Sequence, residues 1–243
     1  MDIRTRSATW FIGLVAGACL FAATALYVAL QLGIGVPAPP VSADNAALFA
    51  WWRPLQWLTT SVHLFAGFGL AAIGVLGIQL SRVRDEADDG IGLGGAMLGV
   101  GGVLTAVGQL VQMGGNRGVL DASKTTIDPG VLGAIGYTTD SITQALYIVG
   151  YAGFGVGVLA ISLSAVAATD RFGRLVGVVF GVALLGLSLF NLTDPLDLAD
   201  PLTGLIGLVL APVWLWRLVS DPGRSRGTVT SGARPAERPV QPS

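Results

Sequence analysis

Polar side chains recur at helical spacing within otherwise apolar stretches of this chain, and they are the candidates for a binding or catalytic site. On each stretch they lie three or four residues apart, so each set lines one side of a helix. Two such sets are Thr105, Gln109 and Gln112, and Asp140, Gln144, Tyr147 and Tyr151. His63 is the only histidine among them. The sequence predicts an outward-facing polar pocket whose candidate lining residues are His63, Gln109, Gln112, Gln144, Tyr147 and Asn191.

The chemistry open to these side chains is hydrogen bonding. Amides, hydroxyls and one imidazole suit a neutral ligand better than an ion, and they also suit hydrogen bonds between helices at roughly 0.6 kcal/mol each. A single histidine cannot ligate a haem twice or form a histidine-based metal site, and the single cysteine, Cys19, excludes a cysteine-rich one. No metal, cofactor or catalytic residue is therefore predicted. An enzyme would have to use His63 with Asp140 or Asp194, and no nucleophile–base pair supports it.

The elements that must position these groups are membrane-spanning helices. A helix of about 20 apolar residues crosses the hydrocarbon core of a bilayer, and at such lengths only a helix satisfies its own backbone in lipid. The sequence thus predicts an all-α bundle of six transmembrane helices. Their expected ranges are 9–34, 55–80, 91–113, 141–168, 175–192 and 202–219.

Composition supports an integral membrane protein. The chain is 52% hydrophobic and 12% charged, whereas roughly 25% of residues are charged in a soluble domain. Its net charge of −1 gives no field that would attract nucleic acid. The expected partners are the lipid bilayer and either another membrane protein or further copies of this chain. The expected location is the cell membrane.

Positive residues predict the orientation. Eleven of the 14 Lys and Arg residues fall before the first stretch, in two alternate loops, and at the end of the last stretch or after it, while Arg53, Arg117 and Lys124 fall on the opposite side. Because cytoplasmic segments carry the excess of positive charge, both termini are predicted to be cytoplasmic. The indole rings fit the same topology, with Trp10, Trp214 and Trp216 expected at the inner interface and the other three at the outer one.

The segments between and after the stretches are expected to lack regular structure. Residues 35–54 carry four prolines, and residues 114–140 form the longest expected loop. The tail at 220–243 is rich in Pro, Gly, Ser and Arg and is predicted to be disordered in the cytoplasm. The first stretch resembles a signal peptide, but its apolar run exceeds the 7–15 residues of a signal sequence, so we interpret it as an uncleaved anchor.

Glycine spacing suggests how the helices pack. Glycines four residues apart share one face and let two backbones approach closely. The packing glycines predicted on this basis are Gly95, Gly99, Gly153, Gly157, Gly173, Gly177 and Gly181. The sequence Ala-Gly-Phe-Gly also occurs at 66–69 and at 152–155. A duplicated helical hairpin, formed by the second and third and by the fourth and fifth stretches, would explain the two copies, but chance matching in a glycine-rich membrane protein explains them more simply.

Three classes of function remain open on this evidence. The first is a non-catalytic membrane subunit or a binder of a small neutral or lipid-like molecule. The second is a passive or neutral-solute transporter, since the absence of acidic and basic residues from most stretches disfavours ion or proton coupling. The third is a membrane enzyme that uses His63.

Overall fold

The computed structural model describes residues 3–37, 45–82, 89–125, 127–164, 171–193 and 198–220, and within these ranges the chain is all-helical without strands. Six helical segments are long and apolar enough to cross a membrane, which confirms the helical class and the six spans predicted from the sequence. The predicted disordered tail, from residue 221 on, lies outside the described residues, as do Arg84 and Asp194.

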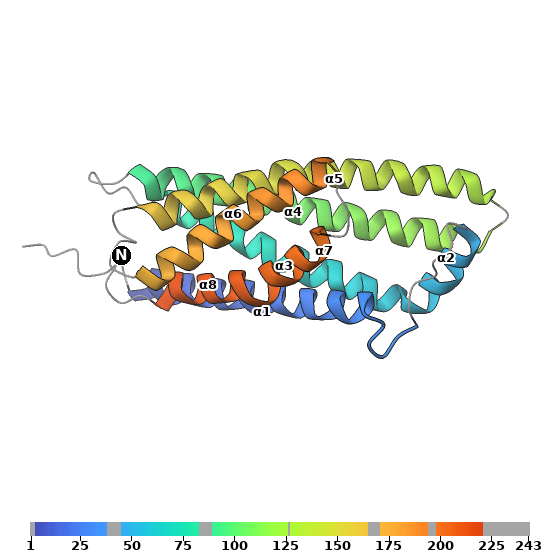
Figure 1. The fold of residues 1–243 in the computed structure, drawn as a ribbon, viewed down its shortest axis with the longest axis horizontal. Helices are drawn as coiled ribbons and strands as arrows, with labels where there is room; N and C mark the ends of the chain where they lie inside the picture. Colours follow the sequence, from blue (N-terminus) through green and yellow to red (C-terminus); the bar gives the residue numbers. More distant parts are fainter. Residues whose placement is uncertain are drawn as a thin grey trace, which may run out of the picture.

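The helices form a closed ring in chain order. Each long helix packs on the next, and the last span packs back on the first. Figure 1 shows that the beginning of α1 and the end of α8 lie together at one end of the bundle, which we call the terminal end. The elements are α1 (Ile3–Gln31), α2 (Asn45–Trp52), η1 (Arg53–Leu55), α3 (Gln56–Ser81), α4 (Asp89–Ala122), α5 (Pro129–Leu163), α6 (Arg171–Thr193), α7 (Ala199–Leu205), η3 (Ile206–Leu210) and α8 (Ala211–Ser220).

Helices α4 and α5 are much longer than a bilayer requires. They contain 34 and 35 residues, so each spans about 50 Å at 1.5 Å per residue, against about 30 Å for the hydrocarbon core. The loop predicted over 114–140 is therefore wrong, because α4 continues to Ala122 and α5 already begins at Pro129. Asp128 caps α5 by accepting a hydrogen bond from the Gly130 amide at 2.6 Å. The two helices extend past α1 and α6 at what we call the projecting end, where α2 lies beside them (Figure 1).

A small hydrophobic core explains why the projecting part is helical. Phe49 of α2 packs with Val119 and Leu120 of α4 and with Leu132 of α5, and all four side chains are buried. These apolar residues lie outside the stretches that were recognised as spans, and folding them into a helical cap removes them from water. We call this unit, formed by α2 and the ends of α4 and α5, the projecting cap.

Glycines on two faces of α4 allow this helix to pack closely against both α3 and α5. Gly94, Gly101 and Gly108 lie seven residues apart and face α5, whereas Gly95 and Gly102 lie seven apart and face α3. A Cβ atom added to Gly102 would come within 2.8 Å of the Gly74 backbone nitrogen in α3. A strict seven-residue repeat keeps one face in contact along nearly parallel helices, so α4 can be sandwiched between two partners.

The glycines predicted from four-residue spacing differ in how tightly they pack. A Cβ on Gly95 would lie 2.8 Å from the Gly77 carbonyl oxygen, and one on Gly157 would lie 2.5 Å from the Leu98 nitrogen. Gly99 and Gly153 make ordinary contacts, with their nearest neighbours at 3.4 Å. In α6, Gly177 and Gly181 face α5, and Gly173 is half-buried. The seven-residue lines on α4 were missed because only four-residue spacing was considered.

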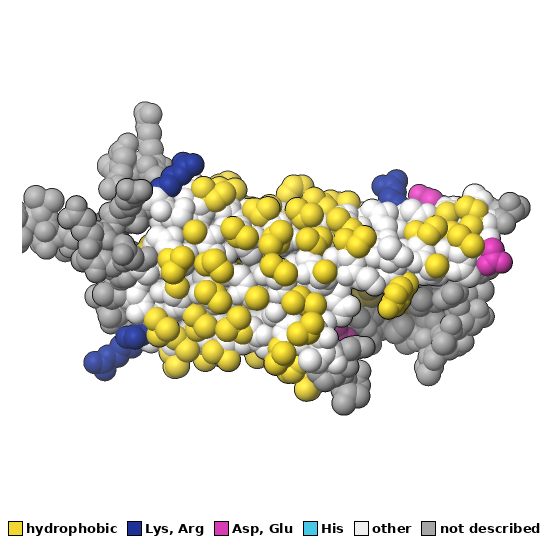
Figure 2. Space-filling model, turned by 90° about the horizontal axis from the view of Figure 1, so that it is seen from above, with side chains coloured by type: hydrophobic (Ala, Val, Ile, Leu, Met, Phe, Trp, Pro, Cys, Tyr) yellow, Lys and Arg dark blue, Asp and Glu magenta, His cyan; other side chains and the backbone are white. Residues whose placement is uncertain are grey.

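Aromatic side chains fill the ring toward the terminal end. Phe180 is fully buried between Phe154, at a ring distance of 5.5 Å, and Trp214, at 5.6 Å. The prediction that Trp214 lies at the interface is wrong, because its ring faces the interior and its indole donates to the Ser162 hydroxyl at 3.2 Å. Trp10 and Trp216 are exposed, as an interfacial position requires. Figure 2 shows hydrophobic side chains spread over the middle of one face, with Lys and Arg toward both ends.

The last span is irregular at its centre. Residues Ile206–Leu210 form a π-helical turn just before Pro212. Proline lacks the amide that would continue the helical ladder, and a wider turn is one way for a helix to accommodate it. Gly207 in this turn lies against the Thr24 hydroxyl of α1. The span therefore changes direction between α7 and α8 (Figure 1).

Candidate functional site

The six residues predicted for the pocket form hydrogen bonds in pairs across neighbouring helices. His63 joins α3 to α4, Tyr147 joins α5 to α4, and Gln144 joins α5 to α6. We call this set of six residues the polar cluster. Its bonds lie near the level where α6 ends, at Asn191, and thus toward the projecting end of the bundle.

His63 and Gln109 meet because both lie on the facing surfaces of α3 and α4. Gln109 follows Gly95 and Gly102 at seven-residue spacing, so it belongs to the line on α4 that faces α3. The His63 Nδ1 atom lies 2.7 Å from the Gln109 side-chain oxygen. With that oxygen as acceptor, Nδ1 carries the proton, and the neutral ring presents Nε2 as an acceptor to its surroundings.

Tyr147 reaches across to α4 over a glycine. Its hydroxyl donates to the Gln112 side-chain oxygen at 2.9 Å. Its ring covers Gly108, where an added Cβ would lie 2.7 Å from a ring carbon. The glycine therefore gives the aromatic ring the room to lie against α4. One turn further along α5, the Tyr151 ring lies 5.6 Å from the Tyr147 ring.

Two bonds hold α5 to α6 at this level. The Gln144 side-chain amide donates to the Asn191 carbonyl oxygen at 2.6 Å, near the end of α6. One turn deeper, the Ser188 hydroxyl donates to the Ile148 carbonyl oxygen at 2.7 Å. The Asn191 side chain bonds within its own helix, to the Leu187 carbonyl oxygen at 2.8 Å, and so does not reach the other members of the cluster.

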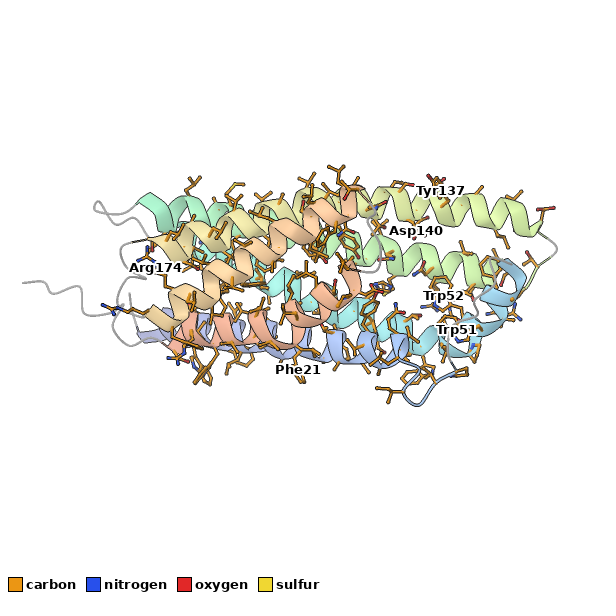
Figure 3. The ribbon with its side chains drawn as sticks, in the orientation of Figure 1. Phe21, Trp51, Trp52, Tyr137, Asp140 and Arg174 are labelled. Carbon is orange, nitrogen blue, oxygen red and sulfur yellow. The ribbon has the colours of Figure 1, made fainter. Side chains whose placement is uncertain are left out.

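The acid proposed to assist His63 does not hydrogen-bond it. Asp140 is exposed on α5, one turn from Gln144 toward the projecting end and next to Tyr137 (Figure 3). Its carboxylate lies within electrostatic range of His63, but the ring nitrogen is bonded to Gln109 instead. The other acid, Asp194, lies outside the described residues. No group of three His, Cys, Asp or Glu side chains suited to a metal ion occurs in the part of the chain that the structure describes.

Two tyrosines outside the predicted set belong to the same region. The Tyr27 hydroxyl of α1 donates to an Asp200 carboxylate oxygen of α7 at 2.5 Å. Tyr27 also lies within electrostatic range of Tyr151, across the interior of the ring. Both tyrosines fall on the polar stripes visible in the sequence. The sequence could not predict that the two tyrosines interact electrostatically, because α1 and α5 are neither consecutive in sequence nor packed as neighbours.

Comparisons with protein-family models, with curated proteins and with solved structures find no match to this chain. The role of the polar cluster therefore has to be argued from its own contacts. Those contacts can orient a hydrogen-bonding molecule, and they also join α3, α4, α5 and α6 through side chains.

The bond between His63 and Gln109 is expected to couple the two helices measurably. In a double-mutant cycle of His63→Leu and Gln109→Leu, we expect an interaction free energy of about 0.6–1.7 kcal/mol, the range for hydrogen bonds inside membranes. The measurement is the free energy of unfolding in mixed micelles. The matched control combines His63→Leu with Gln144→Leu, whose amide bonds Asn191, and should be additive within about 0.5 kcal/mol. Additivity in the first cycle would show that the pair contributes nothing.

Proposed function

We propose that this chain is a non-catalytic multi-pass protein of the cell membrane that binds a small neutral or lipid-like molecule at the polar cluster, from the outer side. The observation that carries the proposal is the environment of Tyr151. This side chain is half-buried, and its ring lies 5.6 Å from the Tyr147 ring on the same face of α5. Its hydroxyl has no hydrogen-bond partner among the described residues.

Such a side chain is typical of an interior recess. A tyrosine hydroxyl enclosed by protein usually finds a hydrogen-bond partner, because leaving it without one costs free energy. A molecule or water in the recess would supply the missing partner. The half-buried rings of Tyr27 and Tyr147 and the free Nε2 face of His63 supply the further polar contacts that a ligand site needs.

The orientation is part of the proposal. We infer that the terminal end faces the cytoplasm, because the segments there carry the excess of Lys and Arg counted in the sequence. The projecting cap and the polar cluster then face the outside. Asp121 in the cap pairs with Arg117 at 3.8 Å and with Lys124 at 2.7 Å, as suits a segment in water.

A duplicated hairpin is a further part of this interpretation. Gly67 of α3 lies against α4 near Ala106, and Gly153 of α5 lies against α4 near Gly101. Gly95 and Gly177 both face the helix that precedes them in the chain. Gly95 and Gly177 are thus placed as a duplication of α3–α4 as α5–α6 requires, whereas Gly67 faces the helix that follows it and Gly153 the helix that precedes it, which counts against the duplication. A superposition of residues 56–113 on 142–192 that does not place Gly67 on Gly153 would refute it.

A transporter of neutral solutes is the second candidate, and the irregular last span favours it. Helices interrupted near the middle of the membrane are common at transport sites. The π-helical turn at Ile206–Leu210 interrupts the span that carries Asp200, the partner of Tyr27. Catalysis by His63 receives less support, because Gln109 holds the ring and Asp140 does not bond it.

Cysteine accessibility tests the proposal. Cys19→Ser removes the only native thiol, so each new cysteine can be labelled alone. In intact cells, Tyr151→Cys and Gly118→Cys are expected to react with a membrane-impermeant methanethiosulfonate, the first through the recess and the second on the exposed end of α4. The matched control is Val158→Cys, two turns deeper on the same face of α5, where the side chain is fully buried.

The labelling results test two things separately: the orientation of the protein in the membrane, and the accessibility of position 151 from the outside. Labelling at Ser220→Cys in intact cells would reverse the orientation, since this residue ends α8. Labelling at Gly118→Cys without labelling at Tyr151→Cys would keep the orientation and refute a recess that opens to the outside. Equal labelling at Tyr151→Cys and Val158→Cys would indicate a loosened protein, so Tyr151→Cys would then give no support to the proposed site.

A further inference from the structure

Three of the four tyrosines of the chain lie in the same region of the bundle. Tyr147 and Tyr151 lie on one face of α5 with their rings 5.6 Å apart, and Tyr27 of α1 lies close enough to Tyr151 for an electrostatic interaction. The three side chains are half-buried and belong to helices on opposite sides of the interior. We call them the tyrosine cluster. The fourth, Tyr137, lies away from them on the projecting part of α5 and is 76% exposed (Figure 3).

Carboxylates border the tyrosine cluster on two sides. Asp200 accepts the hydrogen bond of Tyr27 at 2.5 Å, and Asp140 lies within electrostatic range of Tyr147. Neither acid has a Lys or Arg partner among the described side chains. The cations at the projecting end are held in the cap, where Arg53 donates to Ser123 and Lys124 pairs with Asp121. The region around the tyrosine cluster is therefore rich in π-electrons and negatively charged.

We propose that the tyrosine cluster is a binding site for an organic cation, an alkylammonium or quaternary ammonium group carried by a free amine or by a lipid headgroup. This inference rests on the proposed function, because it assigns a ligand class to the same site. It keeps the site of the proposed function and replaces the neutral molecule named there with a cation, because Asp200, which the sequence did not place beside the polar stripes, accepts the hydrogen bond of Tyr27.

The chemistry favours a cation over a neutral molecule for two reasons. An ammonium group over a tyrosine face is attracted by the ring quadrupole, and groups of aromatic rings are a common way to recognise quaternary ammonium ions. The carboxylates at the border attract the same charge over a longer distance, and they would repel an anion. A neutral molecule of the same shape gains neither effect. The Tyr151 hydroxyl, which has no partner among the described residues, could bond an alcohol or ester oxygen on the ligand.

The test uses choline and its uncharged isostere, in which carbon replaces the nitrogen. Binding of each to the purified full-length protein is measured by calorimetry in nanodiscs. Choline is expected to bind about tenfold more tightly than the isostere, because the two differ in charge and hardly in shape. Nanodiscs of phosphatidylcholine and of phosphatidylglycerol distinguish the sources. Weaker choline binding in phosphatidylcholine supports a lipid headgroup as the natural occupant, and equal binding in both supports a free amine.

Substitutions distinguish the contribution of the tyrosine rings to choline affinity from that of the carboxylate charge. Tyr151→Phe keeps the aromatic face and removes only the hydroxyl, so it is expected to lose less choline affinity than Tyr151→Leu, which should lose about tenfold. Asp200→Asn should weaken choline binding and leave binding of the isostere unchanged. The matched control is Tyr137→Leu, which removes the tyrosine of α5 outside the cluster and should change nothing. All variants are first checked for unaltered thermal unfolding.

Failure of this inference is distinguishable from failure of the proposed function. Equal affinity for choline and its isostere, both lost in Tyr151→Leu, would overturn the cation class and keep a ligand site. Choline binding that survives Tyr151→Leu would place the cation elsewhere. If neither probe binds although a cysteine at position 151 is labelled, the inference is wrong while the recess remains. An unlabelled cysteine there would refute the proposed function itself.

Discussion

The substitution Gly101→Ala is expected to destabilise this protein by about 3 kcal/mol, although it adds a single methyl group. A Cβ at this position would overlap the backbone of Phe154 in α5 and lie 2.7 Å from the Gly150 carbonyl oxygen. A backbone cannot turn aside as a flexible side chain can, so α4 and α5 would have to separate. Overpacking in well-packed interiors typically costs 1–3 kcal/mol, and the expectation lies at the upper end for this reason.

The matched control for Gly101→Ala is the same exchange at Gly118, on the exposed end of the same helix. No atom lies within 4 Å of a Cβ added there. Alanine forms helix better than glycine by about 1 kcal/mol, so Gly118→Ala should stabilise the protein slightly. The two variants are compared by the midpoint of unfolding in mixed micelles. If both shift the midpoint in the same direction, the close approach of α4 to α5 does not limit stability.

The sequence predicted the helical class and the six spans because their signal is local. A run of about 20 apolar residues has few alternatives to a membrane helix, whatever the rest of the chain does. The projecting cap could not be predicted in the same way. Val119, Leu120 and Leu132 are too few to signal a span, and their burial depends on Phe49, which lies some 70 residues earlier in the sequence. Local composition therefore suggested a loop over 114–140, whereas contacts with a distant part of the chain stabilise helices there.

The sequence could predict which residues belong to the polar cluster, but it could not predict which of them hydrogen-bond to each other. Helical spacing indicates which side of each helix His63 or Tyr147 occupies, but only the packing of the ring decides that one meets Gln109 and the other Gln112. The seven-residue lines of glycine on α4 contain that information, since Gln109 continues the line that faces α3. The contact between Tyr27 and Asp200 had no such signal, because it depends on how the irregular last span returns to α1.

Loss of the Phe180 ring is the second large effect expected. Phe180 is fully buried and makes edge contacts with Phe154 and Trp214, so it links α6 to both α5 and α8. Phe→Ala exchanges in cores cost 3–5 kcal/mol, part of which is transfer of the ring from water. In a membrane the separated helices remain in lipid, which is as apolar as the core, so the transfer part is small. The cavity and the lost ring contacts remain, and we expect about 3 kcal/mol for Phe180→Ala.

The control for Phe180→Ala is Phe68→Ala on α3, where the ring is 65% exposed on the outside of the bundle. Its removal leaves no cavity, so the midpoint of unfolding should move by less than about 0.5 kcal/mol in equivalent free energy. Phe180→Leu should fall between the two, because leucine refills part of the space but restores no ring contact. A loss for Phe68→Ala as large as that for Phe180→Ala would mean that the protein surface facing lipid, and not the aromatic core, holds the helices together.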